Sequence, residues 1–352
     1  MHGGDIYRNK VEYDFSVNLN PAGIPSEVND ALQEALSHIS EYPDLQYRTL
    51  RNELSKFWNV PEDRILLGNG ASELITATIL SLRPKTCLLT APAYTGYENV
   101  LRQNLPACEI QHVHLAPEDG FVMNESLPQA IRRIKPDLLI LTNPNNPNGL
   151  LIPQDVLEET LLAAKETGTI LLMDECFLAL TGEDTTRSLI HRNPESLPET
   201  IVLRAFTKTF AIPGVRVGYA ITSGTALAAR VSVPLPEWNL SVLAEKAGAA
   251  CLACGDFVVE SAKLVAKERA YLTSGLTKLG LEVYPSDANY ILFRAEDSDL
   301  SLKLLSKGIL IRPCDDFHGL TNHHYRVAVM DRVRNEKLLA VLEEVISISQ
   351  SL

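Results

Sequence analysis

The chain has 352 residues, of which 45% are hydrophobic and 22% charged, as is typical of a globular enzyme. Its formal net charge of −12 leaves no basic surplus to neutralise phosphates, which argues against a nucleic-acid partner. No apolar run approaches the ~20 residues of a membrane span and the first residues do not resemble a signal peptide, so we expect a cytoplasmic protein without a membrane partner.

Residues 1–47 are predicted to form a loop, a short strand, a second loop and a helix, with Asn and Pro punctuating the start. From residue 48 to about 257, helical stretches alternate with short apolar runs, which is typical of a mainly parallel sheet buried between helices. The strands expected there are 65–67, 86–90, 138–142, 170–173, 201–203 and 217–221.

After residue 257 the pattern changes to an α+β arrangement. The elements expected there are a helix over 258–279, strands over 282–284, 289–293, 309–311 and 325–329, and a last helix from residue 334. We therefore predict an α/β fold with a large domain over 48–257 and a smaller α+β domain over 258–352. Residues 1–47 are expected to pack with the small domain and a partner subunit.

The six cysteines are too few and too scattered for a disulfide framework, so reduced thiols are expected. Cys251 and Cys254 have the spacing of a redox or metal motif. They lie in an alanine-rich helical run, however, where buried small side chains are the favoured interpretation.

A glycine-rich turn, Gly68-Asn-Gly-Ala-Ser-Glu73, follows the first strand of the large domain and opens a helix. The amides of Gly70, Ala71 and Ser72 can bind an anion at the positive end of that helix. The turn is not a dinucleotide fingerprint, because the third glycine is missing. The alternative is an ordinary turn with Ser72 as the N-cap.

Asp174-Glu-Cys-Phe177 stands at the carboxyl end of the most apolar run, at the edge where open α/β sheets bind ligands. A nearly buried carboxylate there needs a cation to stay charged. The protonated pyridine nitrogen of pyridoxal phosphate is such a cation. The alternatives for Asp174 are a helix N-cap or one half of a magnesium site with Glu175.

Two further turns follow predicted strands. In Asn143-Pro-Asn-Asn-Pro-Asn-Gly149, Asn146 can donate an amide hydrogen to a phenolate oxygen, although a plain rigid turn also fits. In Pro92-Ala-Tyr94, Tyr94 can stack on an aromatic ring, although a core tyrosine is the commoner outcome.

Lys208 lies directly after Thr207 and eight residues before Arg216. A lysine that forms a Schiff base needs a desolvated, rigid site in which its amine is neutral. A phosphate on the same ligand needs hydroxyl, amide and guanidinium donors close by. The alternative is a surface lysine and an arginine in an ordinary salt bridge.

These stretches, together with Ala211-Ile-Pro-Gly-Val-Arg-Val-Gly-Tyr219, resemble fold-type-I pyridoxal phosphate enzymes of the class I/II aminotransferase superfamily, in order and spacing across nearly the whole chain. The resemblance implies that Lys208 carries the cofactor and moves protons, and that Asp174 binds the pyridine nitrogen. It implies no metal. The other cofactor residues that it implies are Asn146 on the ring oxygen, Tyr94 against the ring, and Gly70, Ala71, Ser72, Thr207 and Arg216 around the phosphate.

By the same resemblance, Tyr42 in Glu41-Tyr-Pro-Asp44 matches a tyrosine that reaches the cofactor phosphate from the partner subunit, which implies a homodimer.

Two positions depart from the family pattern. Phe177 stands where many aminotransferases carry a tyrosine that hydrogen-bonds the ring oxygen. Ala205 replaces a frequent hydroxyl near the phosphate, so Thr207 and Arg216 should contribute more to phosphate binding.

Two arginines near the C-terminus, Arg312 and Arg326, are each at the edge of a predicted strand. Arg326 can hold the α-carboxylate of an amino acid through two parallel hydrogen bonds. Arg312 would then be free for a second anion on the substrate. The alternative for both is a surface salt bridge in an acidic chain.

Two subfamilies act on phosphorylated small substrates, the histidinol-phosphate aminotransferases and the threonine-phosphate decarboxylases of corrinoid synthesis. The chain is more similar to the decarboxylases in His2-Gly-Gly4, in Asp14-Phe-Ser-Val-Asn-Leu-Asn-Pro21, in Phe177 and in its C-terminal strands. The resemblance implies that His2 and Asn18 contact the substrate. For His2 the alternative is a frayed terminus.

The expected function is therefore decarboxylation of a small phosphorylated L-amino acid. The alternatives are an aminotransferase of the histidinol-phosphate type and a non-catalytic ligand sensor. The two enzymes differ in which Cα bond stands perpendicular to the cofactor ring, since only the electrons of that bond overlap the π system.

Overall fold

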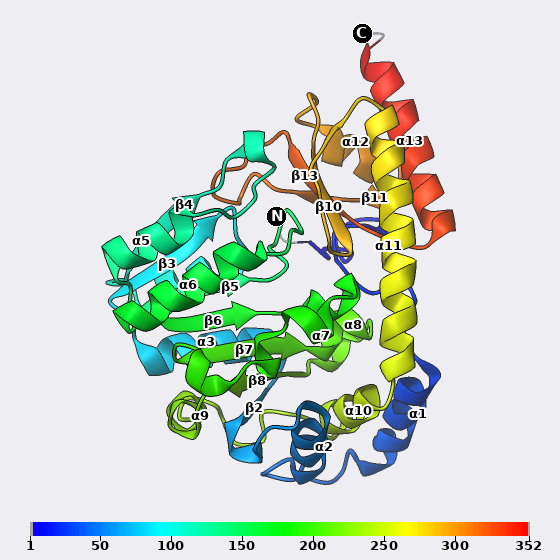
Figure 1. Ribbon diagram of the computed structural model, residues 1–352. Helices are drawn as coiled ribbons and strands as arrows, with labels where there is room; N and C mark the ends of the chain where they lie inside the picture. Colours follow the sequence, from blue (N-terminus) through cyan, green and yellow to red (C-terminus); the bar gives the residue numbers. More distant parts are fainter. Residues whose placement is uncertain (1–2, 351–352) are drawn as a thin grey trace.

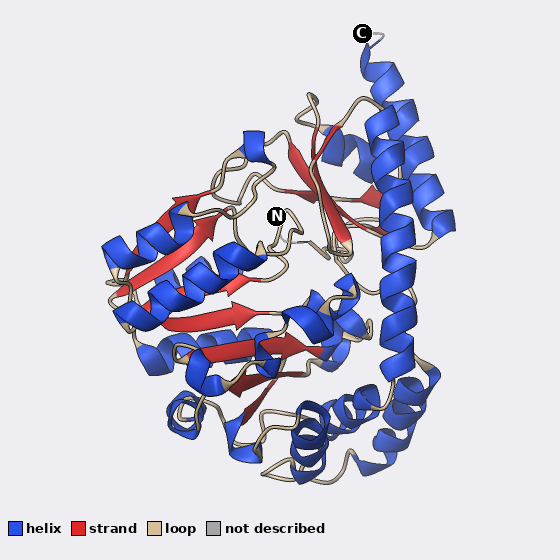
Figure 2. Ribbon diagram, viewed as in Figure 1, coloured by secondary structure: helices blue, strands red, loops and turns tan. Residues whose placement is uncertain are grey.

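The computed structural model describes the backbone of residues 3–350 and the side chains of residues 3–347. A seven-stranded sheet lies between layers of helices. A smaller four-stranded sheet packs near the two long helices α11 (Gly255–Lys278) and α13 (Arg332–Gln350) (Figures 1 and 2). This arrangement confirms the predicted α/β fold class.

The strands of the large sheet follow the order β2, β8, β7, β6, β5, β3 and β4 from one edge to the other. β8 is antiparallel to both of its neighbours, and the remaining neighbouring pairs are parallel. The predicted strands are all present, as β2 (Ile65–Gly68), β3 (Thr86–Ala91), β5 (Leu138–Thr142), β6 (Ile170–Asp174), β7 (Thr200–Ala205) and β8 (Gly218–Thr222).

The sheet also contains an edge strand that the sequence did not indicate, β4 (Glu109–His114), which pairs in parallel with β3. Of its six residues only Val113 is buried. The strand therefore lacks the continuous apolar run that marks a central parallel strand, because one of its sides faces solvent.

Helices cover both faces of the large sheet because successive side chains of a strand point to opposite faces. In β5, Leu139 and Leu141 pack into one core and Ile140 into the other. The helices on the first face include α5 (Ser126–Ile134) and α6 (Gln154–Thr167), and those on the second are α3 (Ala71–Leu82), α4 (Thr95–Asn104) and α9 (Thr225–Ser232).

Three helices pack together at one end of the molecule, below the large sheet in the view of Figure 1. They are α1 (Ser26–Ala35), α2 (Arg48–Trp58) and α10 (Val242–Leu252). α10 contacts both of the others, and its buried Ala247 and Cys251 belong to the same core as one face of the sheet.

The C-terminal part has an antiparallel sheet in the order β12, β13, β10 and β9. Its strands are β9 (Glu282–Val283), β10 (Tyr290–Arg294), β12 (Arg312–Pro313) and β13 (His324–Ala328), and α12 (Leu300–Ser306) lies beside it. The sequence did not predict β12, because two residues with a proline form no recognisable run.

The N-terminal residues join the C-terminal part. β1 (Tyr13–Asp14) pairs in parallel with β11 (Ile309–Leu310), and Phe15 is fully buried in the C-terminal core. α11 contacts both the 3₁₀ helix Leu178–Thr181 of the large part and α13, so it connects the two parts of the molecule (Figure 1). The boundaries proposed after residues 47 and 257 remain predictions.

All six cysteines are free thiols, and Cys251 and Cys254 are both buried, as expected for packing residues. Among the described helices, none has the length and apolar character that crossing a membrane requires.

Candidate active site

A cavity of about 330 Å³ opens where the carboxyl ends of the central strands of the large sheet meet the N-terminal residues and the C-terminal sheet. The register of the sheet sets Thr142, at the end of β5, beside Asp174, at the end of β6. The predicted site residues that line the cavity are Asn18, Ala71, Ser72, Tyr94, Asn146, Asp174, Thr207, Lys208, Arg216, Arg312 and Arg326.

Lys208 lies on α8 (Phe206–Thr209), a single helical turn that follows β7 directly. Its Nζ is 5.9 Å from the centroid of the Phe177 ring. Burial lowers the pKa of Lys208, and the positive charge of Arg326 lowers that pKa further. Both effects favour the neutral amine, which is the nucleophilic form.

Asp174 is buried at the end of β6 and is held by two hydrogen bonds. The Tyr97 hydroxyl donates to Oδ2 over 2.7 Å, and the backbone N–H of Cys176 donates to Oδ1 over 2.9 Å. Within the described part of the chain, no lysine, arginine or histidine forms an ion pair with this carboxylate. Asp174 is thus oriented by neutral donors and can receive a cationic group from the cavity.

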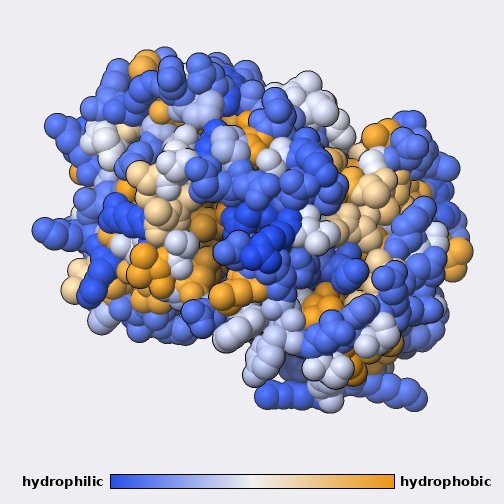
Figure 3. Space-filling model, turned by 90° about the horizontal axis from the view of Figure 1, so that it is seen from below, coloured by the Kyte–Doolittle hydropathy of each residue, from blue (hydrophilic) through white to orange (hydrophobic). Residues whose placement is uncertain are grey.

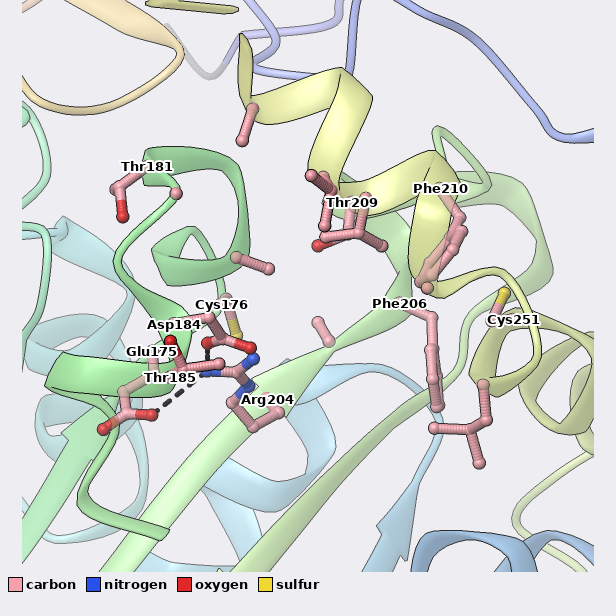
Figure 4. Close-up of a pocket in the computed structure, with 18 of the residues that line it drawn as sticks. Glu175, Cys176, Thr181, Asp184, Thr185, Arg204, Phe206, Thr209, Phe210 and Cys251 are labelled. Carbon is pink, nitrogen blue, oxygen red and sulfur yellow. Dashed lines mark hydrogen bonds and ion pairs between the residues drawn. The ribbon is translucent and has the colours of Figure 1, made fainter. Parts of the chain in front are cut away.

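Glu175 points away from this cavity into a second one of about 640 Å³ (Figure 4). Its carboxylate accepts hydrogen bonds from the Ser188 hydroxyl and the Leu189 amide, at 2.6 and 2.8 Å. It also pairs with Arg204 over 3.1 Å, and Arg204 reaches Asp184 over 2.7 Å. Asp174 and Glu175 therefore do not converge on one metal ion, and the magnesium alternative is not supported.

The glycine-rich turn and Arg216 form a cradle at one wall of the cavity. Gly70 has a φ of +76°, and a Cβ at this position would lie 2.3 Å from Nη2 of Arg216. α3 begins at the next residue, Ala71, and its first amides have no preceding turn to bond. Arg216 bonds only to backbone carbonyls in the described chain, those of Pro213 at 3.2 Å and Asn69 at 3.5 Å. A phosphate fits this set of donors.

Arg326 lies on β13 with its side chain buried against Tyr290, whose ring centroid is 5.5 Å from the guanidinium carbon. Nη1 donates to Oδ1 of Asn146 over 2.6 Å, and Nη2 donates to the carbonyl of Ser16 over 2.9 Å. Nε is buried without a partner, and no described carboxylate pairs with the side chain. A buried guanidinium without a counter-ion is suited to an anionic ligand.

Asn146 follows β5 in the turn that the sequence singled out and is buried at the cavity wall. Because its Oδ1 accepts from Arg326, the Asn146 amide is fixed in the orientation that leaves Nδ2 as the donor toward a ligand. The one contact therefore links the residue expected to bind the ring oxygen with the residue expected to bind the carboxylate.

Arg312 also faces the cavity, but it is not free as expected. Its Nη2 forms an ion pair with both oxygens of Asp316, at 2.8 and 2.7 Å, and its Nη1 donates to the carbonyl of Pro313. Arg312 is the first residue of the two-residue strand β12, and Asp316 lies in the loop that follows, so Asp316 can fold back onto Arg312. A substrate anion at Arg312 would have to share the guanidinium with Asp316.

The N-terminal residues close another wall. Asn18 is buried, and its Oδ1 has no hydrogen-bond partner, so it is available to a donor in the cavity. Asn20 fastens this segment to the lysine turn, because its backbone N–H donates to the carbonyl of Lys208 over 3.0 Å. Gly3 also lines the cavity, and His2 lies outside the described residues.

Two predicted tyrosines have different positions. Tyr94 lies at the mouth of the cavity, with its ring edge-on to that of Tyr97 at a centroid distance of 5.3 Å. Tyr42 is 81% exposed and packs on Trp238 at 5.1 Å, outside the cavity of its own chain. The expected contact of Tyr42 with the cofactor phosphate of a partner subunit stays a prediction.

Sequence reasoning missed three aromatic residues that contact the predicted ones. Tyr97 donates a hydrogen bond to Asp174. The rings of Tyr290 and Phe317 lie beside the guanidinium groups of Arg326 and Arg312, respectively. Tyr97 follows Tyr94 by three residues on α4, so helical spacing could have indicated a shared face. For Tyr290 no local signal exists, because its partner Arg326 is distant in sequence. Phe317 is close in sequence to its partner Arg312, but the two meet through a loop that has no regular spacing.

Known proteins resemble the chain over almost its full length. The family described as "Aminotransferase class I and II" matches residues 11–342. Threonine-phosphate decarboxylase of Salmonella typhimurium is 36% identical over 95% of this chain and 91% of its own length. Histidinol-phosphate aminotransferase of Caldanaerobacter subterraneus is 30% identical over 96% and 93%. The crystal structure of histidinol-phosphate aminotransferase from Clostridium acetobutylicum superposes with a TM-score of 0.87 at 32% identity, covering 95% of this chain and 99% of the other.

Proposed function

The chain belongs to the class I and II aminotransferase family of pyridoxal phosphate-dependent enzymes, and from that premise we propose that it removes carbon dioxide from L-threonine O-phosphate. The observation that carries the proposal is the buried guanidinium of Arg326, which faces the same cavity as Lys208 and has no carboxylate partner in the described chain. The similarity to the Salmonella decarboxylase supports this choice of substrate.

The residues around the cavity fit pyridoxal phosphate. Lys208 would carry the cofactor through its neutral amine, and Asp174 would bind the protonated pyridine nitrogen. Asn146 would donate to the ring oxygen from Nδ2, and Tyr94 would lie against the ring. The phosphate would be bound by the cradle made of Gly70, Ala71, Ser72, Thr207 and Arg216.

When bound, pyridoxal phosphate supplies an aromatic system that takes up the electron pair of a bond broken at the substrate Cα. The chain's own groups do the rest. Asp174, which two fixed donors hold in place, would stabilise the positive charge of the pyridine nitrogen. Phe177 and Ala205 leave the lysine side of the cavity apolar, which supports the low pKa of Lys208.

Arg326 would orient the substrate by binding its carboxylate. The guanidinium is already held by Asn146 and Ser16, so little side-chain entropy is lost when a carboxylate binds. Loss of the carboxylate as carbon dioxide leaves an electron pair on Cα. Lys208, whose amine faces the same cavity, would take up the proton that the substrate ammonium group loses on binding and would deliver it to Cα, which completes the product.

The substrate phosphate would lie between Arg312 and the N-terminal residues. Arg312 forms an ion pair with Asp316, and its guanidinium lies 5.1 Å from the centroid of Phe317 at the cavity wall. Asn18 is the polar side chain that the N-terminal segment contributes to the described cavity wall together with Ser16. The C-terminal sheet and the N-terminal residues thus both contribute to the site where the substrate would bind.

A second candidate is amino-group transfer of the histidinol-phosphate type. It is favoured by the superposition on the Clostridium aminotransferase at a TM-score of 0.87. The same groups would serve both reactions, because Lys208 can either deliver a proton to Cα or remove one. The two candidates therefore differ in the orientation of the substrate rather than in the residues that bind it.

We further propose that two copies of the chain associate, with Tyr42 of each reaching the cofactor phosphate of the other. Tyr42 lies among exposed apolar side chains, Leu36, Ile39, Leu45 and Trp238, which a monomer would leave in water. Figure 3 shows apolar groups gathered between hydrophilic ones on the face seen from below, where α1, α2 and α10 lie. A second copy covering this surface would bury them.

The proposal is tested by mixing pyridoxal phosphate-loaded protein with L-threonine O-phosphate and measuring carbon dioxide and the phosphorylated amino alcohol. One of each per substrate consumed is expected, and the Lys208→Ala variant should release neither. Amino-group transfer to a 2-oxo acid without carbon dioxide would contradict the decarboxylase and favour the second candidate. No reaction with this substrate would contradict its assignment.

A further inference from the structure

Three side chains with metal-binding atoms converge outside the cavity. They are Glu98 on α4, His112 on β4 and His318 in the connection between β12 and β13. Nε2 of His112 and Nε2 of His318 lie 3.2 and 3.3 Å from the same oxygen, Oε2 of Glu98. The ligand atoms of all three residues are within 4.8 Å of one another.

These distances match those expected around a tetrahedral zinc ion. Zinc binds histidine nitrogen and carboxylate oxygen at about 2.0–2.2 Å, so adjacent ligand atoms of a tetrahedral site are about 3.3–3.6 Å apart. The two measured contacts to Oε2 agree with this spacing. Hydrogen bonds from both imidazoles to one oxygen would also fit the distances, so the chemistry of the group has to be tested directly.

The surroundings of the three residues favour an ion. The other oxygen of Glu98 is bound by Arg102 at 2.7 Å through Nε, which fixes the carboxylate and directs Oε2 toward the histidines. His318 is 55% exposed, which gives an ion and a water ligand access from solvent.

We propose that Glu98, His112 and His318 bind a divalent transition-metal ion of the zinc type, with a water molecule as the fourth ligand. Sequence analysis expected no metal, because the three ligands are far apart in the chain and converge only through the fold. This site is distinct from the cavity around Lys208 and does not depend on the proposed reaction.

The ion would connect two parts of the molecule beside the cavity. Glu98 belongs to the helix that directly follows Tyr94, and His318 directly follows Phe317, which lines the cavity. The connection that carries His318 reaches the β4 edge of the large sheet (Figure 1). A bound ion would therefore hold this connection against α4 and β4 and restrict the opening of the cavity wall.

The experiment uses tag-free, cofactor-loaded protein from which metals have been removed by a chelator, titrated with zinc in a calorimeter. Wild type should bind one zinc ion per chain. His318→Gln, which can still donate a hydrogen bond to Glu98, should weaken binding at least tenfold, as should Glu98→Gln. Equal zinc binding by wild type and both variants, or no binding by wild type, would overturn the proposal.

Two controls separate this site from others. His38→Ala removes an exposed histidine that pairs with Glu41 over 3.2 Å but, among the described residues, has no third ligand beside it, and it should leave zinc binding unchanged. Cobalt in place of zinc should give the visible bands of a nitrogen and oxygen site. A thiolate-to-cobalt charge-transfer band would assign the ion to a cysteine and overturn the proposal. Circular dichroism of each variant checks that the fold is retained.

Discussion

Tyr97 orients the carboxylate on which the proposed cofactor site depends. Its hydroxyl is buried, donates to Asp174 over 2.7 Å and lies 3.0 Å from the hydroxyl of Thr142. Without Tyr97, Asp174 would lose this hydrogen bond and keep the one from the backbone N–H of Cys176. Tyr97 itself does not reach the reacting atoms, so its role is to position another residue.

Replacing Tyr97 by Phe keeps the ring and removes this hydrogen bond. A hydrogen bond to a charged group contributes about 1.5–3 kcal/mol, so we expect kcat to fall roughly tenfold or more with little change in KM. The cofactor absorption spectrum should also shift, which a purely structural defect would not cause. Tyr325→Phe removes another buried tyrosine hydroxyl, bonded to the carbonyl of Asp297, and should change neither. A Tyr97→Phe enzyme with normal kcat and spectrum would contradict this role.

Replacing Arg326 by Lys keeps the charge and removes the planar pair of donors. Lysine cannot bind a carboxylate through two parallel hydrogen bonds and leaves Oδ1 of Asn146 without its donor. We expect KM for the substrate to rise at least tenfold, as measured by steady-state kinetics. Arg332→Lys, at the ion pair with Glu268, is the matched control and should not affect KM. An unchanged KM in Arg326→Lys would show that the substrate carboxylate binds elsewhere.

At the scale of single residues, the sequence predicts those site residues that stand in a recognisable local pattern. Lys208 next to Thr207, and Asp174 after an apolar strand, were identified in this way, and the fold brings them to one cavity. The ion pair of Arg312 with Asp316 was missed because four residues of loop can fold in many ways. The contact of Tyr97 with Asp174 was missed because it joins α4 to β6.

The turn before α3 is the element that would bind the cofactor phosphate, and Gly70 determines its shape. Replacing Gly70 by Ala adds a Cβ 2.3 Å from Nη2 of Arg216 and strains a φ of +76°. We expect the affinity for pyridoxal phosphate to fall at least tenfold in equilibrium titrations, because Arg216 must move away from the cradle.

Gly168→Ala is the matched control for Gly70→Ala. Gly168 has a φ of +70° and a ψ of 20°, in the left-handed helical region, and no atom within 4 Å of an added Cβ, so it reports a positive-φ substitution without a steric contact. Such a substitution costs about 1–2 kcal/mol of stability and should not affect cofactor binding. Equal cofactor affinity in the two variants would contradict the role of the cradle.

At the scale of elements, continuous apolar runs identified the central strands, because a parallel strand covered on both faces has few polar side chains. β4 was missed because a half-exposed edge strand carries Glu109, His112 and His114. The antiparallel direction of β8 is set by its pairing with β2 and β7. No residue pattern within β8 indicates that direction.

For the whole molecule, the ion pairs beneath the active site predict how stability depends on pH. Burial raises the pKa of Glu175 from 4.5 to about 7, although Arg204 lowers it in part. The folded protein therefore holds a proton that the unfolded chain releases, so this contribution to stability is fully present below pH 4.5 and is lost as the pH rises through 7.

Glu175→Gln should remove that dependence, because its amide oxygen can still accept from the Leu189 N–H and its NH2 group can donate to the Ser188 hydroxyl oxygen. The free energy of unfolding of wild type should fall relative to the variant by about 3 kcal/mol between pH 4.5 and 8, since each pKa unit corresponds to about 1.4 kcal/mol. Denaturant titrations at several pH values measure the difference. Parallel curves for the two proteins would contradict the raised pKa.

A dimer in which Tyr42 acts on the neighbouring subunit predicts complementation. Lys208→Ala and Tyr42→Ala should each have low activity alone. In a mixed dimer, both substitutions would affect the same site and leave the other site intact. Co-expression followed by purification with two different tags should therefore recover up to about half of the wild-type activity. No recovery in isolated mixed dimers would contradict a contribution of Tyr42 across the interface.

The most direct test of the account is to find the residue that carries the cofactor. Protein loaded with pyridoxal phosphate is reduced with borohydride, digested and analysed by mass spectrometry. The account predicts one reduced pyridoxyl phosphate group per chain, on the peptide that contains Lys208, and no labelling of Lys208→Ala. A label on another lysine, or an unlabelled wild-type chain, would contradict the assignment of this cavity as the active site.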